Sequence, residues 1–222
     1  AFTQIAQRTD AARVRRELAS AALRLADTHD VTPLLRALMA HKEDAKDSVI
    51  PQLVWLAYEK VLASPARQGG GDVKNPSKQN QPAAAGRSLV ADELAWLAEQ
   101  APGNEFVRDQ IVPRTMRRLV ATGQPENLKR CIEFVAKLKD AASREKALDG
   151  LVVALAGQVV DAPEGWASLQ AEIAKDANPK LVALANKLGV AFRDPVALKR
   201  AYEVVRNSRA SIAERIEALR QV

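Results

Sequence analysis

Residues 41–62 read HKEDAKDSVIPQLVWLAYEKVL and contain, in order, an acidic loop, a helix start and an amphipathic helix. Asp47 can accept hydrogen bonds from the free amides of the first turn, so it predicts an N-cap. Pro51 follows early in the helix, where its missing N–H has no intrahelical partner to lose. Trp55 and Glu59 lie four residues apart and share one helical face. The stretch therefore predicts a capped helix with a proline near its start.

The composition favours helices over sheets. Hydrophobic residues make up 47% of the 222 residues, but aromatic residues only 4%. Ala, Leu and Val dominate, which suits closely packed helices, whereas a sheet would need more aromatic and β-branched residues. Lys and Arg number 33 against 27 acidic residues, a net charge of +6 that is spread along the chain. Such a mild excess permits nucleic-acid binding without requiring it.

The sequence leaves the cellular compartment open. Its single cysteine, Cys131, excludes an internal disulfide and so says little about redox environment. No apolar run approaches the ~20 residues needed to span a membrane. Residues 1–10 lack the basic start and apolar core of a signal peptide, although a mature or excised domain would have lost one.

Apolar residues recur at helical spacing on both sides of residues 64–88. Residues 106–120 form one such helix, with Pro113 inside it. Residues 64–88 contain three consecutive glycines and three prolines but no apolar stripe, which predicts a loop or insertion. About eleven helices and no strand are expected. The clearest buried stripes are Val14, Leu18, Ala21 and Leu25; Val31, Leu34, Leu35 and Leu38; and Leu128, Cys131, Ile132, Val135 and Leu138.

The C-terminal part of the chain has several helix-start signals. A capping residue followed by proline, or Ser followed three residues later by Glu, is typical of a helix N-terminus. We expect starts at Ser143, Pro163, Asn178–Pro179, Asp194–Pro195 and Ser211 with Glu214.

A repeat of similar helical segments decides the architecture. The intervals between segments are 30 to 36 residues, apart from one of 62 that spans the insertion. Repeats of this length built from paired helices are typical of α-solenoids. The early prolines Pro51 and Pro113 favour HEAT repeats over the tetratricopeptide type. The sequence therefore predicts one right-handed HEAT-like α-solenoid over residues 1–222, with segments centred on Val14, Ile50, Val112, Leu148, Val182 and Ile212.

The acidic loop is the best polar cluster in the sequence. His41, Glu43, Asp44 and Asp47 could converge on a hard cation, which makes a metal-assisted enzyme one hypothesis. Lys42 and Lys46 offset that charge, however, and Asp47 is already used as a cap. A structural loop is the favoured interpretation, with Trp55 in the core and Glu59 at its rim.

Nucleophilic catalysis has little support. Cys131 lies on the apolar stripe of its helix, as a buried structural thiol would. The two histidines, His29 and His41, belong to no metal-ligand or triad pattern, and the glycines at 69–71 lack the Lys-Ser/Thr of a phosphate loop. We therefore predict no catalytic, metal or cofactor residue in this chain.

Arginines offer an alternative function. Arg114, Arg117 and Arg118 share one helical face, as do Arg13 and Arg16, and a basic concave surface can follow a phosphate backbone. The HEAT-like alkylpurine DNA glycosylases are basic solenoids of similar length, so nucleic-acid binding is the runner-up. Acidic residues interleave with these arginines, and no Trp/Arg/Asp grouping of that family can be placed.

Four segments in order resemble one known family. Residues 41–59 resemble the H-x-E-D-A-x-D…P-x-x-x-W-x-x-x-E segment of the PVC-type haem-binding CxxCH proteins, also described as putative membrane-bound dehydrogenases. Residues 12–26 resemble the preceding helix. Residues 148–166 resemble an L-x-G-L…P-x-G-W stretch that ends at Trp166. Residues 188–198 resemble an L-x-V-x-F-G-D-x-x-A-L turn, with Arg193 in place of its glycine.

The resemblance implies a HEAT region between a β-propeller and a c-type cytochrome module in an exported protein. That family's c-type haem and possible quinone would belong to other domains, since this chain has no Cys-x-x-Cys-His. A periplasmic or cell-envelope location follows if the resemblance holds. The hypothesis is thus a non-enzymatic scaffold that binds protein, either neighbouring domains or another chain.

Overall fold

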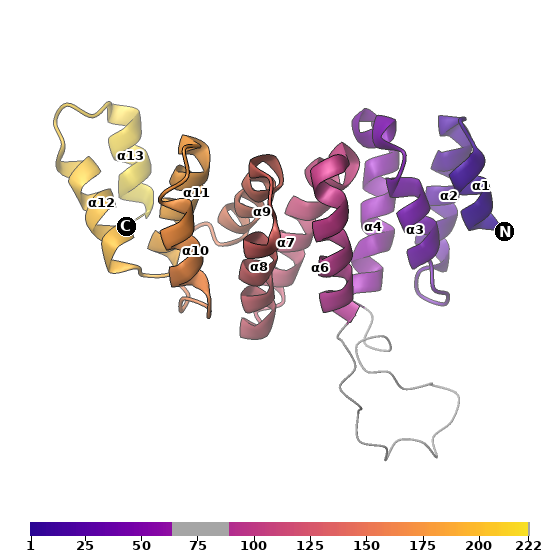
Figure 1. Ribbon diagram of the computed structural model, residues 1–222, viewed down its shortest axis with the longest axis horizontal. Helices are drawn as coiled ribbons and strands as arrows, with labels where there is room; N and C mark the ends of the chain where they lie inside the picture. Colours follow the sequence, from indigo (N-terminus) through magenta and orange to yellow (C-terminus); the bar gives the residue numbers. More distant parts are fainter. Residues whose placement is uncertain (64–88, 222) are drawn as a thin grey trace, which may run out of the picture. The chain divides into compact units, whose positions relative to one another are not determined.

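The computed structural model describes residues 1–63 and 89–221, and these contain twelve α-helices (Figure 1). No strand occurs in that part of the chain. The predicted all-α class is confirmed, with twelve helices where about eleven were expected. The loop predicted at residues 64–88 lies outside the described residues. The chain divides into two compact units, Ala1–Ile111 and Val112–Val222.

In the first unit, helices two apart in the chain lie side by side. Helix α2 (Ala12–Leu25) packs along α4 (Ile50–Ala63), and α1 (Phe2–Arg8) packs on α3 (Thr32–Met39). Helix α6 (Leu89–Gln100) follows, and short segments complete the unit: 3-10 helices η1 (Lys42–Lys46) and η3 (Ala101–Gly103), and π-helix η4 (Phe106–Ile111). Fully buried side chains fill its core, among them Leu35, Leu38, Ile50, Tyr58 and Phe106.

The second unit repeats this packing over seven helices. They are α7 (Val112–Ala121), α8 (Pro125–Lys137), α9 (Ala141–Ala154), α10 (Trp166–Ile173), α11 (Pro179–Ala191), α12 (Pro195–Arg206) and α13 (Ile212–Gln221). Helix α9 packs between α7 and α11, α11 also contacts α13, and α8 contacts α10. The backbones of α7 and α9 approach so closely that a Cβ added at Gly150 would lie 2.6 Å from the carbonyl oxygen of Pro113.

Several predicted helix starts are confirmed. The Asp47 carboxylate accepts from the amides of Val49 and Ile50 at 2.8 and 2.9 Å, so it satisfies free N–H groups at the start of α4. The other confirmed caps are Asn178 on Lys180, Asp194 on Val196 and Ala197, and the reciprocal bonds between Ser211 and Glu214.

Two predicted starts are displaced. Helix α9 begins at Ala141, because Asp140 is its N-cap and accepts from the amide of Ser143 at 2.8 Å. Helix α10 begins at Trp166 rather than Pro163, after Gly165 adopts a left-handed φ of 86°. That conformation is inexpensive only for glycine, so the chain turns there before the helix starts.

The prediction of a single α-helix over residues 106–120 is wrong for the first six residues. Residues Phe106–Ile111 are π-helical, and α-helical geometry begins only at Val112. Pro113 is therefore the second residue of α7. A proline is tolerated at that early position because it disrupts no hydrogen bond of the helix interior.

The buried face expected for 12–25 is also displaced by one position. Val14 is 38% exposed, whereas Arg15 is 2% exposed and points into the unit with Leu18 and Ala22. Arg15 has a buried carboxylate partner, and that pairing turns the helix away from its simplest apolar stripe. The stripe over Val31, Leu34, Leu35 and Leu38 is fully buried, as predicted.

Candidate functional site

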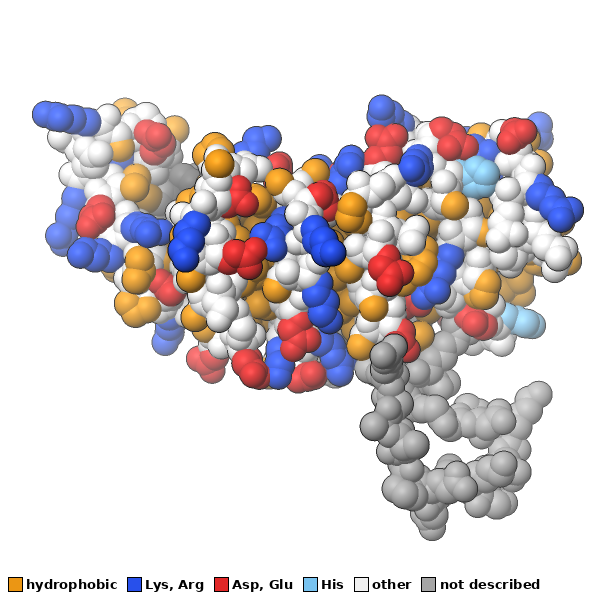
Figure 2. Space-filling view, in the orientation of Figure 1, with side chains coloured by type: hydrophobic (Ala, Val, Ile, Leu, Met, Phe, Trp, Pro, Cys, Tyr) orange, Lys and Arg blue, Asp and Glu red, His pale blue; other side chains and the backbone are white. Residues whose placement is uncertain are grey.

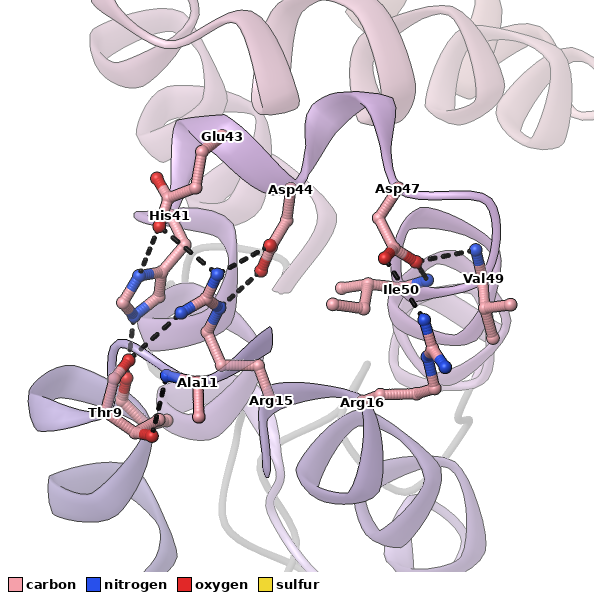
Figure 3. A network of polar contacts seen from close by, with 11 residues as sticks. Thr9, Ala11, Arg15, Arg16, His41, Glu43, Asp44, Asp47, Val49 and Ile50 are labelled. Carbon is pink, nitrogen blue, oxygen red and sulfur yellow. Dashed lines mark hydrogen bonds and ion pairs between the residues drawn. The ribbon is translucent and has the colours of Figure 1, made fainter. Parts of the chain in front are cut away.

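Arg15 and Asp44 form the centre of the polar cluster in the first unit (Figure 3). Arg15 Nε and Nη2 donate to the two carboxylate oxygens of Asp44 at 2.5 and 2.7 Å, a bidentate pair. Arg15 Nη1 donates to the carbonyl of Thr9 at 3.0 Å. The hydrogen bonds that Arg15 donates to Asp44 raise the pKa of Arg15. The side chains of Arg15 and Asp44 are 3 and 4% exposed, so this pair joins α2 to η1 within the core.

His41 bridges α1 and η1. Its Nε2 lies 2.7 Å from the Ala6 carbonyl, and its Nδ1 lies 3.1 Å from Glu43 Oε1 (Figure 3). Both partners are acceptors, so only the doubly protonated ring donates to both. The pKa of Glu43 is lowered, first by the hydrogen bond from its own backbone amide and further by the bond from His41. The His41 ring therefore connects α1 to η1.

Asp47 connects α4 to α2. Hydrogen bonds from the Ile50 and Val49 amides, together with Arg16 Nη2 at 3.2 Å, lower the pKa of its carboxyl group. The carboxylates of the acidic loop therefore form hydrogen bonds and ion pairs with other groups of the protein. Arg15 supplies the balancing positive charge, which we had expected from Lys42 and Lys46. Within residues 1–63 and 89–221, no three His, Cys, Asp or Glu side chains gather as a metal site would require.

The aromatic residues singled out in the sequence lie in the two cores. Trp55 is 9% exposed and its ring lies 6.3 Å from that of Tyr58. Glu59 is half-buried on the same helix. In the second unit, Trp166 is 2% exposed and meets the Phe192 ring edge-on at 4.9 Å between centroids. Offset and edge-on arrangements of this kind stabilise packing.

Cys131 is a buried thiol on α8. Its side chain is inaccessible, and burial raises its pKa to about 12. The thiolate is the nucleophilic form, so this environment suppresses reactivity. The buried position on the apolar stripe agrees with the prediction.

The arginine faces are mixed rather than purely basic. Arg16 pairs with Asp47, while Arg13 is exposed on α2. On α7, Arg117 is exposed and Arg114 and Arg118 are half-buried; burial and the nearby charge of Arg117 lower the pKa of Arg114. On the face drawn in Figure 2, blue and red side chains interleave within each unit.

A second buried ionic cluster was not anticipated from the sequence. Glu93 on α6 is 2% exposed and accepts from Tyr58 Oη at 2.9 Å and from Arg36 Nη2 at 2.8 Å. The Arg36 guanidinium also stacks over Trp96 at 4.8 Å from the ring centroid. Burial and Glu93 raise the pKa of Tyr58 well above its ordinary value. One signal was available: Glu93 lies between Val90 and Leu94 on an otherwise apolar face.

An open groove runs over α3 beside this cluster. It has a volume of about 850 Å³, a floor on α3, and walls on α1 and α6. Its lining includes Gln7 of α1, Arg36 of α3, and Trp96 and Gln100 of α6. The groove thus combines an aromatic ring, a cation and amide side chains.

No family model, curated protein or solved structure matches the chain. No helix in the described segments is both long and apolar enough to cross a membrane. The resemblance of residues 41–59 to the haem-binding CxxCH proteins therefore stays a prediction.

Proposed function

We propose that the chain is a HEAT-like α-solenoid that acts as a non-enzymatic scaffold and binds protein. The observation that carries the proposal is the packing of alternate helices within each unit: α2 on α4, and α7, α9, α11 and α13 in succession. These helices contain the segments that recur in the sequence at intervals of 30 to 36 residues, apart from the interval of 62 between α4 and α7. Stacked repeats contact only their neighbours, so they leave long faces open for a partner.

The use of the polar side chains supports a scaffold over an enzyme. Arg15 and Asp44 are buried against each other, Asp47 caps a helix, and the thiol of Cys131 is inaccessible. These groups thus serve ion pairing within the core, helix capping and packing. Catalytic groups, in contrast, need access to a substrate and a pKa suited to proton transfer.

The resemblance of residues 41–59 supports a particular setting. In it, the solenoid lies between an oxidoreductase propeller and a cytochrome module, and the partner is a neighbouring domain or another chain. The location would be the periplasm or cell envelope. A reading frame that continues into a Cys-x-x-Cys-His motif would support this setting, and one that encodes neither module would remove it.

Nucleic-acid binding is the second candidate, and the adjacent Arg114 and Arg117 are its best support. A titration with duplex DNA at low and high salt separates the two functions. Phosphate contacts weaken steeply as salt rises, so binding that is absent even at ~50 mM salt excludes the candidate.

The scaffold proposal is tested by site-specific photo-cross-linking in the source cells. A benzophenone side chain is placed in turn at exposed positions in both units, such as Gln7, Arg13, Glu133 and Tyr202. We expect discrete protein adducts from one face, followed by direct binding of the purified partner in calorimetry. Adducts from none of the exposed faces would overturn the proposal.

A further inference from the structure

Three turns of the second unit share a left-handed backbone conformation. Gly123 follows α7 with a φ of 67°, Gly157 follows α9 with a φ of 70°, and Arg193 follows α11 with a φ of 54°. The helices that these turns end are packed side by side, with α9 between α7 and α11. The three residues therefore occupy equivalent positions after successive neighbouring helices.

A pocket of about 490 Å³ lies among these turns, within the second unit. Its apolar lining consists of Val120, Pro125, Leu128, Leu155, Val159 and Val160. Leu155 is buried, whereas Val159 is 57% exposed. The amide of Val160 donates to the Ala191 carbonyl at 3.0 Å, which holds the turn after α9 against the end of α11. The pocket thus offers an apolar surface that a partner can reach.

Arg193 keeps a side chain where the two equivalent turns have glycine. A left-handed φ brings the Cβ of any other residue close to the backbone, so glycine is favoured there. Arg193 is exposed and belongs to the pocket lining. Its guanidinium has no hydrogen-bond or ion-pair partner in residues 1–63 and 89–221. Backbone strain of this kind is concentrated at binding sites, where the strained residue contacts a ligand.

Asp161 is the other charged residue of the pocket lining. It is exposed, and among the described residues its side chain also has no hydrogen-bond or ion-pair partner. Arg193 and Asp161 do not pair with each other, so each charge is available to an occupant. The occupant that satisfies both carries a negative charge, a positive charge and an apolar group that fits the lining.

The C-terminus of a protein can combine these three features. Its last residue carries the carboxylate and the side chain on the same carbon, so an apolar side chain enters the pocket while the carboxylate meets Arg193. Arginine binds a carboxylate through two parallel hydrogen bonds. An internal Asp or Glu has no apolar side chain on the residue that carries its charge. A basic residue before the last one supplies the positive charge for Asp161.

We propose that the pocket between the turns after α7, α9 and α11 binds the C-terminus of a partner protein that ends in a basic and then an apolar residue. The terminal carboxylate pairs with Arg193, the apolar side chain lies against the valine and leucine side chains, and the basic side chain pairs with Asp161. The proposal rests on the protein-binding function above and assigns to that function one surface and one class of partner.

The test uses the whole chain and four pools of short peptides with an N-terminal fluorescein, followed by fluorescence anisotropy. The first pool ends in Lys-Leu with a free carboxylate. The matched pools end in Lys-Leu amide, in Lys-Ser acid and in Gln-Leu acid. We expect the first pool to bind with a dissociation constant below ~100 µM, and each matched pool to bind more weakly. Each comparison isolates one contact: the carboxylate, the apolar side chain or the basic side chain.

Variants of Arg193 separate binding from folding. Arg193→Gly should bind the Lys-Leu acid pool about tenfold more weakly or worse. It should melt no lower than wild type, because glycine adopts the left-handed conformation freely. Arg193→Lys keeps the charge without the paired hydrogen bonds, so it should retain part of the affinity. Lys199→Gln is the control, since it removes a positive charge from an exposed position outside the pocket and should bind as wild type does.

Two further variants test the rest of the pocket. Asp161→Asn should abolish the preference for Lys-Leu over Gln-Leu, whereas Asp149→Asn on α9 should leave it unchanged. Val159→Asp replaces an exposed valine of the lining with a charged residue and should weaken binding about fivefold or more. Val153→Asp is its control, because Val153 is similarly exposed but lies outside the lining.

The outcomes separate this inference from the function on which it rests. No binding of the Lys-Leu acid pool at ~1 mM, equal binding of acid and amide, or equal binding by wild type and Arg193→Gly overturns the pocket proposal. Displacement of the peptide by 4-methylpentanoate at similar concentrations would assign the pocket to a small apolar acid and overturn it as well. Cross-linked protein partners would in these cases leave the scaffold function standing.

Discussion

Arg15 on α2 and Asp44 in η1 are buried against each other with two parallel hydrogen bonds of 2.5 and 2.7 Å. They are 29 residues apart in the chain, and the pair fixes the acidic loop to the preceding helix. It also explains why Val14 is exposed, because α2 turns its Arg15 side inward.

Removing one partner of this pair should destabilise the first unit strongly. Asp44→Ala leaves the Arg15 guanidinium buried without its counter-charge, which costs ~3–5 kcal/mol in the free energy of unfolding. Glu43→Ala is the matched control, since Glu43 is exposed and contacts Arg15 only at 3.3 Å, and it should cost ~0–1 kcal/mol. Urea unfolding at neutral pH measures both. Equal losses for the two variants would contradict a buried, structural role for Asp44.

Local signals account for the part of the fold that the sequence predicts well. A cap and the amides that it satisfies are two or three residues apart, so Asp47, Asn178 and Asp194 mark their helix starts correctly. The stripe over 31–38 is likewise a local pattern with no charged residue on its buried face.

Local sequence signals do not predict the buried ion pairs, because the two partners of each pair are distant in the chain. Arg36 and Glu93 are 57 residues apart. From the sequence alone Arg15 would be predicted to be exposed, and only its buried pairing with Asp44 explains its position in the core. For the same reason the groove over α3 could not be predicted, since α1, α3 and α6 form it together.

Gly150 is required by the close approach of α7 and α9. In Gly150→Ala the added methyl group meets the Pro113 backbone at 2.6 to 2.8 Å, and backbone cannot rotate away as a side chain can. We expect a loss of ~1–3 kcal/mol from overpacking, although alanine favours a helix over glycine by up to ~1 kcal/mol. Gly103→Ala is the control, because no atom lies within 4 Å of its added methyl group. A thermal melt in which Gly150→Ala is as stable as wild type would show that the helices separate easily.

Asp47 should make stability depend on acid pH. Its folded pKa is lowered by the Ile50 and Val49 amides and by Arg16, so its contribution is fully present above the ordinary carboxyl value of ~3.9. That contribution is lost as the pH falls through the lower, folded pKa. Asp47→Asn can still accept from the amides but does not titrate, so its unfolding free energy should decline less steeply below pH ~5. Parallel pH profiles for variant and wild type would exclude this role.

Cys131 should react only when the protein opens. Its thiol is fully buried and its pKa is raised to about 12, so a thiolate-specific reagent meets neither the accessible nor the reactive form in the native state. We expect no reaction with Ellman's reagent at neutral pH, and rapid stoichiometric reaction in urea. Between these limits the rate should follow the opening of the second unit, so substitutions that destabilise α8 should accelerate it. Labelling of the folded chain at the rate of a small free thiol would place Cys131 at the surface and contradict the packing of this helix.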